Sequence, residues 1–192
     1  MPMQYEYTAI PAADVPQASN PIFQHLLDTY ASETSKVITI WRQFSPEEMG
    51  FKAADRSASV LDIMKHQLLS ERRFFGEFMG FSGEPEPAAL VPQELTPAAF
   101  CRRNEELCRA RLARLASCDE KSWLEVVPFF DVQRQRIWVF WRRVLHTAHH
   151  RTQLSVSLRL LGKQVPSSYG PTADITWQGA DPTKSVEAAG RK

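Results

Sequence analysis

Long apolar runs are absent from this sequence of 192 residues. No segment reaches the roughly 18 consecutive apolar residues that would indicate a membrane-spanning helix. Residues 1–16 contain no basic segment followed by an apolar stretch, which is the pattern of a secretory signal. The formal net charge is only +1, so the chain as a whole attracts neither nucleic acids nor acidic partners. We therefore expect a cytoplasmic protein that binds neither membranes nor nucleic acids.

Cysteine and glycine are also scarce. The three cysteines, Cys101, Cys108 and Cys118, form neither an even set nor a Cys-x-x-Cys pair, which argues against a disulfide framework and fits a reducing compartment. Cys101 and Cys108 lie seven residues apart and would share one helical face, where buried thiols are ordinary core residues. The eight glycines form no phosphate-binding loop. These counts exclude a disulfide-stapled small domain and a P-loop nucleotide-binding protein.

Apolar residues, by contrast, are abundant and regularly spaced. They make up 43% of the chain and charged residues 23%, as is typical of a soluble globular protein. Spacings of three and four residues predict amphipathic helices. These helices run from about 21 to 44, from Ser57 or Ser59 to about 79, from 97 to about 117, and from about 133 to 161. The first helix would be capped by Ser19 or Asn20 and the third by Thr96, and Gly162 is a natural stop for the fourth.

The connections between these helices differ in length. Residues 80–96 hold three prolines and two glycines, which predicts a long connection rather than a hairpin. Residues 118–133 are apolar and β-branched, but Pro128 would break a helix there, so we expect a short extended or looped segment near the end of the bundle. With no convincing sheet, the predicted fold is all-α: a four-helix bundle with a long connection between helices two and three.

The two ends of the chain differ in composition from the helical part. Residues 1–19 are rich in proline and alanine, and the last residues are small and polar. We expect an irregular leader over 1–19, one bundle domain over 20–178, and a disordered tail over 179–192.

Several charged side chains are expected to be solvated rather than functional. A carboxylate close to His66 in sequence, Glu71, does not share its helical face, and we interpret it as exposed to solvent. The third helix is rich in arginine, and we expect a solvated face rather than an anion site. Its arginines are Arg102, Arg103, Arg109, Arg111 and Arg114.

Three of the five histidines carry the strongest chemical signal. His146 and His150 are four residues apart, which places them one turn apart on the same face of a helix. Polar side chains that face a bundle interior cost stability unless they bind something. A third imidazole from a facing helix, His66, would complete a three-nitrogen site with an open position, as in catalytic metal sites. His149 is three residues from His146 and could pair with it instead, and spacing alone does not rank the two pairings.

Several motifs resemble those of the DinB/YfiT family of bacterial four-helix-bundle metalloproteins. Residues 56–66 resemble the family's Arg-Ser entry to the second helix, which leads to its first metal histidine. Residues 146–153, His-Thr-Ala-His-His-Arg-Thr-Gln, resemble its His-x-x-x-His-Arg-Gly-Gln stretch, with Thr152 where the family commonly has glycine. Residues 158–171 resemble its tail after the last helix. The resemblance covers about residues 20–175.

This resemblance implies a divalent transition metal, zinc or nickel, bound by His66, His146 and His150, with His149 outside the site. It also implies a homodimer. Similar proteins include S-transferases and isomerases that use low-molecular-weight thiols such as bacillithiol or mycothiol. Gln153, close beyond His150 on the helix, is expected to hydrogen-bond a ligand histidine. Arg151 is expected to support the bundle or to orient an anionic group of the substrate.

Two functions follow as hypotheses. The first is a metal-dependent thiol S-transferase or hydrolase that acts on small electrophiles, with no general base evident among the residues. The alternative is a non-catalytic, stress-linked bundle that binds a metal and dimerises, with an ion that mostly stabilises the fold. The sequence does not indicate the substrate, because side chains from several helices would shape the pocket.

Overall fold

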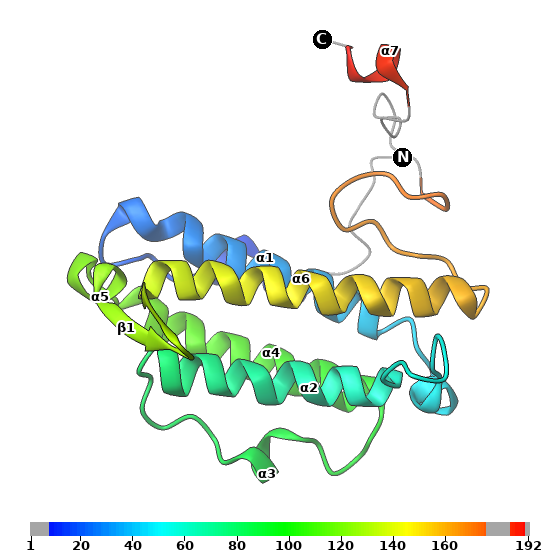
Figure 1. Ribbon diagram of the computed structural model, residues 1–192, viewed down its shortest axis with the longest axis horizontal. Coiled ribbons are helices and arrows are strands. Elements are labelled where there is room, and N and C mark those ends of the chain that lie inside the picture. Colours follow the sequence, from blue (N-terminus) through cyan, green and yellow to red (C-terminus); the bar gives the residue numbers. More distant parts are fainter. Residues whose placement is uncertain (1–7, 176–184, 191–192) are drawn as a thin grey trace.

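The computed structural model describes residues 8–175 and 185–190, and four long helices form its frame (Figure 1). These helices are α1 (Gln24–Trp41), α2 (Val60–Arg73), α4 (Pro97–Ala116) and α6 (Arg136–Leu160). The predicted four-helix architecture is therefore confirmed. Part of the predicted leader, residues 1–7, lies outside the described residues. So does the predicted disordered tail over 179–192, except for 185–190, which include the short helix α7 (Val186–Ala189).

Polar residues cap the long helices at the positions that their sequence context favours. The side chain of Asn20 accepts a hydrogen bond from the amide of Ile22 and opens the 3-10 turn Pro21–Phe23 before α1. Ser59, rather than Ser57, caps α2 in a reciprocal capping box with Asp62. Two further 3-10 turns, Ala12–Asp14 and Pro46–Gly50, lie outside the frame.

The start of α4 and the end of α6 also lie at the residues that the sequence predicts. Thr96 caps α4 through the amide of Ala99, with Pro97 in the first helical position. Gly162 has a φ of 72°, and its left-handed conformation ends α6.

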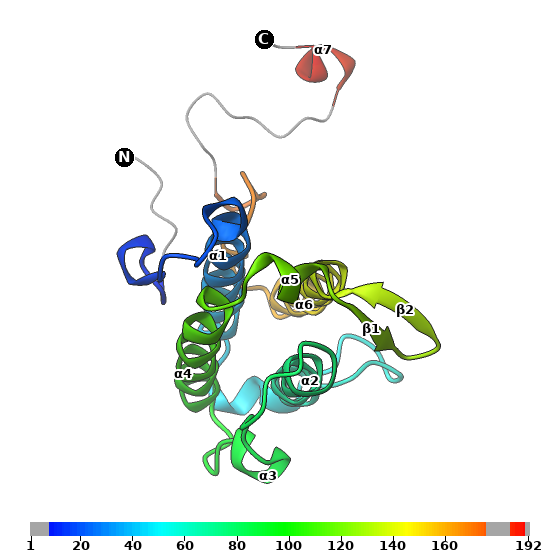
Figure 2. The ribbon, with the colours of Figure 1, turned by 90° about the vertical axis from the view of Figure 1, so that its left-hand side faces the viewer.

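An end-on view shows how the four helices pack (Figure 2). Helix α1 packs along both α4 and α6, and α2 packs along α6. Large side chains fill the interior, and Trp41 of α1 meets Phe100 of α4 edge to face, with ring centroids 6.2 Å apart. Each large apolar side chain that is fully buried contributes about 1.5–3 kcal/mol. Cys101 and Cys108 belong to this core, as predicted.

The long connection between the second and third frame helices is also present. Residues 74–78 continue α2 as one turn of π-helix, and the short helix α3 (Pro87–Leu90) lies within the connection (Figure 1). Gly80 and Gly83 have positive φ values of 70° and 77°, which lets the chain turn away from the end of α2.

The segment between α4 and α6 is more ordered than predicted. It contains a short helix, α5 (Glu120–Leu124), and an antiparallel hairpin of β1 (Val126–Phe129) and β2 (Val132–Gln135), with Val127 opposite Arg134. The expectation of an extended segment is correct for β1, which contains Pro128, but the hairpin and α5 were missed. Their stability comes from tertiary contacts, since Phe129 packs on Phe74 and Phe78 of the π-helical turn.

Two predictions of solvated charge are wrong. Arg111 is only 1% exposed and pairs with Glu84 at 2.7 Å and with Glu71 at 3.2 Å. Glu71 is buried as well and pairs with Arg111 and Arg143. Their partners lie on other helices and in the long connection, which helical spacing within one segment cannot indicate. Arg102 and Arg109, in contrast, are exposed as expected.

Candidate metal centre

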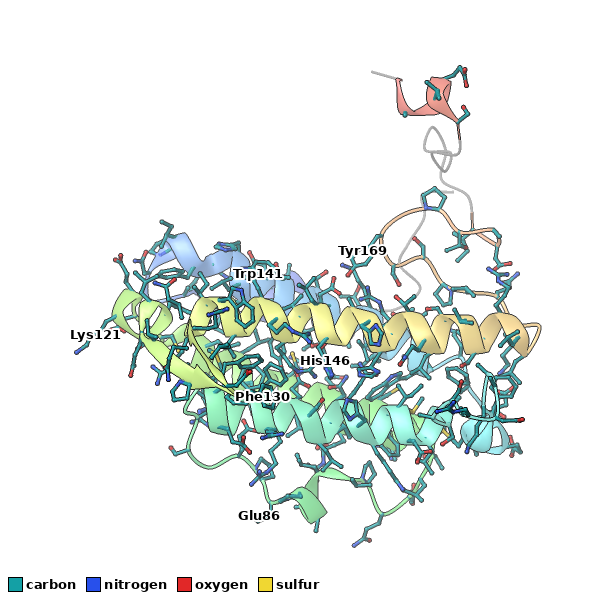
Figure 3. All side chains as sticks on the ribbon, viewed as in Figure 1. Glu86, Lys121, Phe130, Trp141, His146 and Tyr169 are labelled. Atoms are coloured by element: carbon teal, nitrogen blue, oxygen red, sulfur yellow. The ribbon has the colours of Figure 1, made fainter. Side chains whose placement is uncertain are left out.

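Three histidines from two helices, α2 and α6, come together where these helices face each other. His66 belongs to α2, and His146 and His150 are one turn apart on α6. Nε2 of His146 lies 3.3 Å from Nε2 of His66 and 3.2 Å from Nε2 of His150. One ring nitrogen of each residue lies within 4.8 Å of the other two. Figure 3 shows His146 on the side of α6 that faces α2.

Two of these three separations have the value expected around one transition-metal ion. Two zinc–nitrogen bonds of about 2.0–2.1 Å at a tetrahedral angle would separate their nitrogens by about 3.3–3.4 Å. The two Nε2 separations measured from His146, 3.3 and 3.2 Å, are close to that value. The group therefore could hold one ion with three neutral nitrogen ligands.

His149 lies outside this group. Its side chain is exposed, and its ring centroid is 5.0 Å from that of His150. Adjacent helical residues point about 100° apart, so His149 and His150 cannot both face α2. Of the two pairings that the sequence left open, the structure brings together His146, His150 and His66.

Gln153 sets the orientation of one of these rings. Its amide oxygen Oε1 lies 2.7 Å from Nδ1 of His150. An amide oxygen only accepts hydrogen bonds, so Nδ1 of His150 carries the proton and Nε2 keeps its lone pair. That lone pair is the one needed to bind a metal, and such a hydrogen bond commonly fixes the tautomer of a metal-binding histidine.

Arg143 lies on the inner side of His146, a role that sequence reasoning missed. Its guanidinium donates a short hydrogen bond to Oγ1 of Thr147, and its Nη2 donates to the carbonyl of Gln67 at 3.4 Å. Nη1 is also 3.3 Å from Nδ1 of His146. A guanidinium only donates hydrogen bonds, so Nδ1 of His146 can accept from Arg143 only when that nitrogen carries no proton. The hydroxyl oxygen of Thr147 can accept from Arg143 whichever ring nitrogen of His146 is protonated. The spacing of four residues between Arg143 and Thr147 was the sequence feature that could have indicated their contact.

The electrostatic surroundings keep the three imidazoles neutral. Burial, and then the positive charge of Arg143, lower the pKa of His146 to about 3. The same two causes lower the pKa of His66. Burial lowers the pKa of His150, although its hydrogen bond to Gln153 acts in the opposite direction. Neutral imidazole is the protonation state that a metal ligand requires.

Arg151 lies away from the histidines, in a separate buried cluster. It is 2% exposed and donates to Oε2 of Glu33 at 2.6 Å. The hydroxyl of Tyr169 donates to the same carboxylate oxygen, and the Tyr169 ring lies 4.6 Å from the guanidinium. These contacts tie the segment after α6 to α1 and α6, which is a supporting role for Arg151.

Comparison with known proteins identifies the family of this chain. The model of the DinB family matches residues 16–182, which is most of the chain. The chain belongs to the DinB family. No curated protein matches at a significant level. None of the described helices is long and apolar enough to cross a membrane.

Two solved DinB-like proteins share the fold. One, from Bacillus cereus, is 18% identical, with a TM-score of 0.65 over 75% of this chain and 95% of that chain. The other, YjoA from Bacillus subtilis, is 17% identical, with a TM-score of 0.62 over 76% of this chain and 97% of that chain. At such identities the likeness concerns the fold and not the activity.

Proposed function

We propose that this DinB-family protein is a divalent-metal-dependent enzyme that acts on small molecules, either a thiol S-transferase or a hydrolase. His66, His146 and His150 would hold the ion, with zinc or nickel as the metal. The observation that carries the proposal is the convergence of three neutral imidazole nitrogens, with two Nε2 separations of 3.2 and 3.3 Å. Association of the DinB family with metal binding supports it.

The number and charge of the ligands favour catalysis. Three neutral ligands leave the ion its full positive charge, and an ion bound in this way lowers the pKa of a bound thiol or water. Gln153 would keep His150 in the tautomer that binds. Arg143 would oppose protonation of His146, because its fixed positive charge lies next to that ring.

A substrate would approach these histidines from the solvent side. The side chain of His66 is exposed, and those of His146 and His150 are half-buried. On the inner side, the cavity lined by Gln67, Arg143 and Thr147 has a volume of about 10 Å³, the size of one water molecule. That cavity is too small for a substrate. The solvent-exposed side of the three histidines is therefore where the thiol and its electrophile would bind.

A structural role for the ion is the second candidate. His66 and His146 are 80 residues apart in sequence, so an ion bound by both would link α2 to α6. Any ion that binds only the folded chain stabilises it. In that case the protein would be a non-catalytic, stress-linked metal-binding bundle.

The first test is metal content. The wild type would be purified without chelator and without a nickel column, beside His150→Ala and His149→Ala. We expect about one zinc or nickel per chain in the wild type and in His149→Ala, and none in His150→Ala. A metal-free wild type from metal-replete medium, or metal retained in His150→Ala, would overturn the ligand assignment.

The second test separates the two candidates. The metal-loaded protein would be assayed with a low-molecular-weight thiol and 1-chloro-2,4-dinitrobenzene, and with 4-nitrophenyl acetate for hydrolysis. Turnover that requires the metal and is lost in His150→Ala supports the enzyme. Bound metal that raises the melting temperature without turnover of either probe favours the structural role.

A further inference from the structure

The tip of the hairpin between β1 and β2 holds an aromatic side chain in a strained backbone conformation. Phe130 and Asp131 form its two-residue turn, and Phe130 has a φ of 54°. Glycine is the residue that turns of this kind favour where φ is positive. Among the residues that the structure describes, Phe130 is the only one besides glycine with a positive φ. A bulky side chain kept at such a position points to a function for that side chain.

Burial in the fold does not account for Phe130. The residue is 61% exposed, and its ring centroid lies 4.8 Å from that of Phe129 and 5.2 Å from that of Phe78. The guanidinium of Arg73 lies 5.0 Å from the Phe130 ring. Trp138, at the start of α6, is 41% exposed, and its ring centroid lies 5.4 Å from that of Phe129. Two aromatic rings are thus presented to solvent above a buried aromatic ring.

A series of ring contacts connects the hairpin to the histidine group. The ring centroid of Phe129 lies 5.7 Å from that of Phe74, which in turn lies 6.0 Å from that of His146. Phe74 begins the π-helical turn that ends at Phe78, and such turns are frequent at functional sites. Figure 2 shows the hairpin beside α2 and α6, on the side away from α1 and α4. The aromatic rings therefore adjoin the histidine group.

A positive charge lies between these rings and the histidines. Side chains at intervals of four residues form one ridge along a helix. On α6, such a ridge consists of Trp138, Arg142, His146 and His150. Arg142 is exposed and pairs with no carboxylate among the described residues. Burial and the charge of Arg143 lower the pKa of His146 most, and the charge of Arg142 adds to this effect. The guanidinium of Arg142 is therefore available to an anionic group beside the histidines.

We propose that the hairpin tip and Arg142 select substrates that carry an aromatic ring next to a negative charge. The ring would stack on Phe130 and Trp138, and the charge would pair with Arg142. Stacked aromatic rings gain energy beyond the area that they bury, and a guanidinium forms strong, charge-assisted hydrogen bonds with anions. The inference rests on the proposed function in one respect, which is that the histidine group acts on the bound compound.

Equilibrium dialysis of the metal-free protein tests the site without any turnover. The probe is naphthalene-2-sulfonate, which has both features. We expect it to bind about ten-fold more tightly than cyclohexanesulfonate, which lacks the aromatic ring, and than 2-naphthol, which is uncharged at neutral pH. Equal affinity for the three compounds would overturn the proposal.

Variants assign the two halves of the site. Phe130→Gly and Arg142→Gln should each weaken binding of naphthalene-2-sulfonate about ten-fold. The matched controls are Leu95→Ala and Arg102→Gln, which change exposed side chains elsewhere and should bind the probe like the wild type. An unchanged affinity in Phe130→Gly or in Arg142→Gln would contradict the assignment.

The melting temperature of Phe130→Gly separates a binding role from a structural one. Glycine adopts a positive φ without strain, and the ring that is lost is mostly exposed. We therefore expect the melting temperature to change by less than about 3 °C. A much larger fall would show that the ring serves the fold, and would overturn the role in binding.

Proton NMR of the histidine rings tests whether the probe binds beside the proposed metal site. Bound naphthalene-2-sulfonate should shift the ring signals of His146, which is one turn from Arg142. The ring of His25 stacks on Trp141 and should not shift. An unshifted His146 would place the probe elsewhere and overturn the inference. Neither dialysis nor NMR requires metal or turnover, so a failure of the proposed function would appear only in the metal and activity tests.

Discussion

Two polar clusters lie close together on the same two helices, yet they are built differently. The histidine group takes His66 from α2 and His146 from α6. The ionic network takes Glu71 from α2 and Arg143 from α6, and adds Arg111 from α4. In the network every charge faces an opposite charge in the protein. In the histidine group, one ring nitrogen of each residue lies within 4.8 Å of the other two, and the pKa values of all three rings are lowered, so the rings are neutral.

The difference shows which cluster maintains the frame and which is available for chemistry. A buried charge that loses its partner is strongly unfavourable, so the network constrains the relative positions of α2, α4 and α6. Neutral imidazoles carry no such penalty and can keep lone pairs free for a ligand. Arg143 belongs to both clusters, because it pairs with Glu71 and also lies against His146.

The largest effect is expected from the network. Arg111→Met removes the partner of Glu84 and one partner of Glu71, and leaves both carboxylates buried. We expect the free energy of unfolding to fall by about 3–5 kcal/mol. Urea unfolding of the metal-free protein would measure it.

The matched control for this prediction is Arg109→Met on the same helix. Arg109 is exposed, and it pairs with Asp14 and Glu105 at the surface. Exposed pairs contribute about 0–1 kcal/mol, so this variant should unfold nearly like the wild type. A similar decrease in the free energy of unfolding in the two variants would show that the buried network contributes no more to stability than the exposed ion pairs of Arg109.

A smaller effect is expected from Gln153→Ala in the histidine group. The change removes the acceptor that holds the proton on Nδ1 of His150. Loss of such a partner typically weakens metal affinity about 10–100-fold. Competition with a chelating dye would measure zinc affinity, with Ser155→Ala as the control on the same helix. An unchanged affinity, with intact metal binding in the control, would mean that Gln153 does not orient the ligand.

The smallest effect concerns acid stability and the cluster of Arg151. Burial raises the pKa of Glu33, but hydrogen bonds from Lys36 and Tyr169 and the charge of Arg151 outweigh it and lower the pKa below its ordinary value of 4.5. A lowered pKa in the folded state contributes stability above the unfolded value, and this contribution is lost as the pH falls through the folded pKa. Glu33→Gln should therefore lose less stability than the wild type between pH 6 and about pH 3.5.

Urea midpoints at the two pH values would measure this difference. Glu94→Gln, at an exposed carboxylate, is the control and should follow the wild type. If Glu33→Gln were as acid-sensitive as the control, the carboxylate would not be held ionised by its neighbours.

The amino-acid order is sufficient for the four frame helices, and it narrows their caps and the candidate ligands to a few residues: His66, His146 and either His149 or His150. Apolar spacing, the proline and glycine positions and the His146–His150 interval act within a few residues, and local backbone geometry follows from them. The same local signals could not show the hairpin, which depends on Phe129 packing against Phe74. Nor could they show that Arg111 is buried.

Arg111 appeared to be one more arginine on a solvated face, because its partners Glu71 and Glu84 lie 40 and 27 residues earlier in the chain. The choice between His149 and His150 was open for a similar reason. Both fit a one-turn spacing with His146, and only the rotation of α6 against α2 selects the ring that meets His66. Local periodicity thus specifies the helices, whereas pairing between distant residues depends on how the helices pack around the shared core.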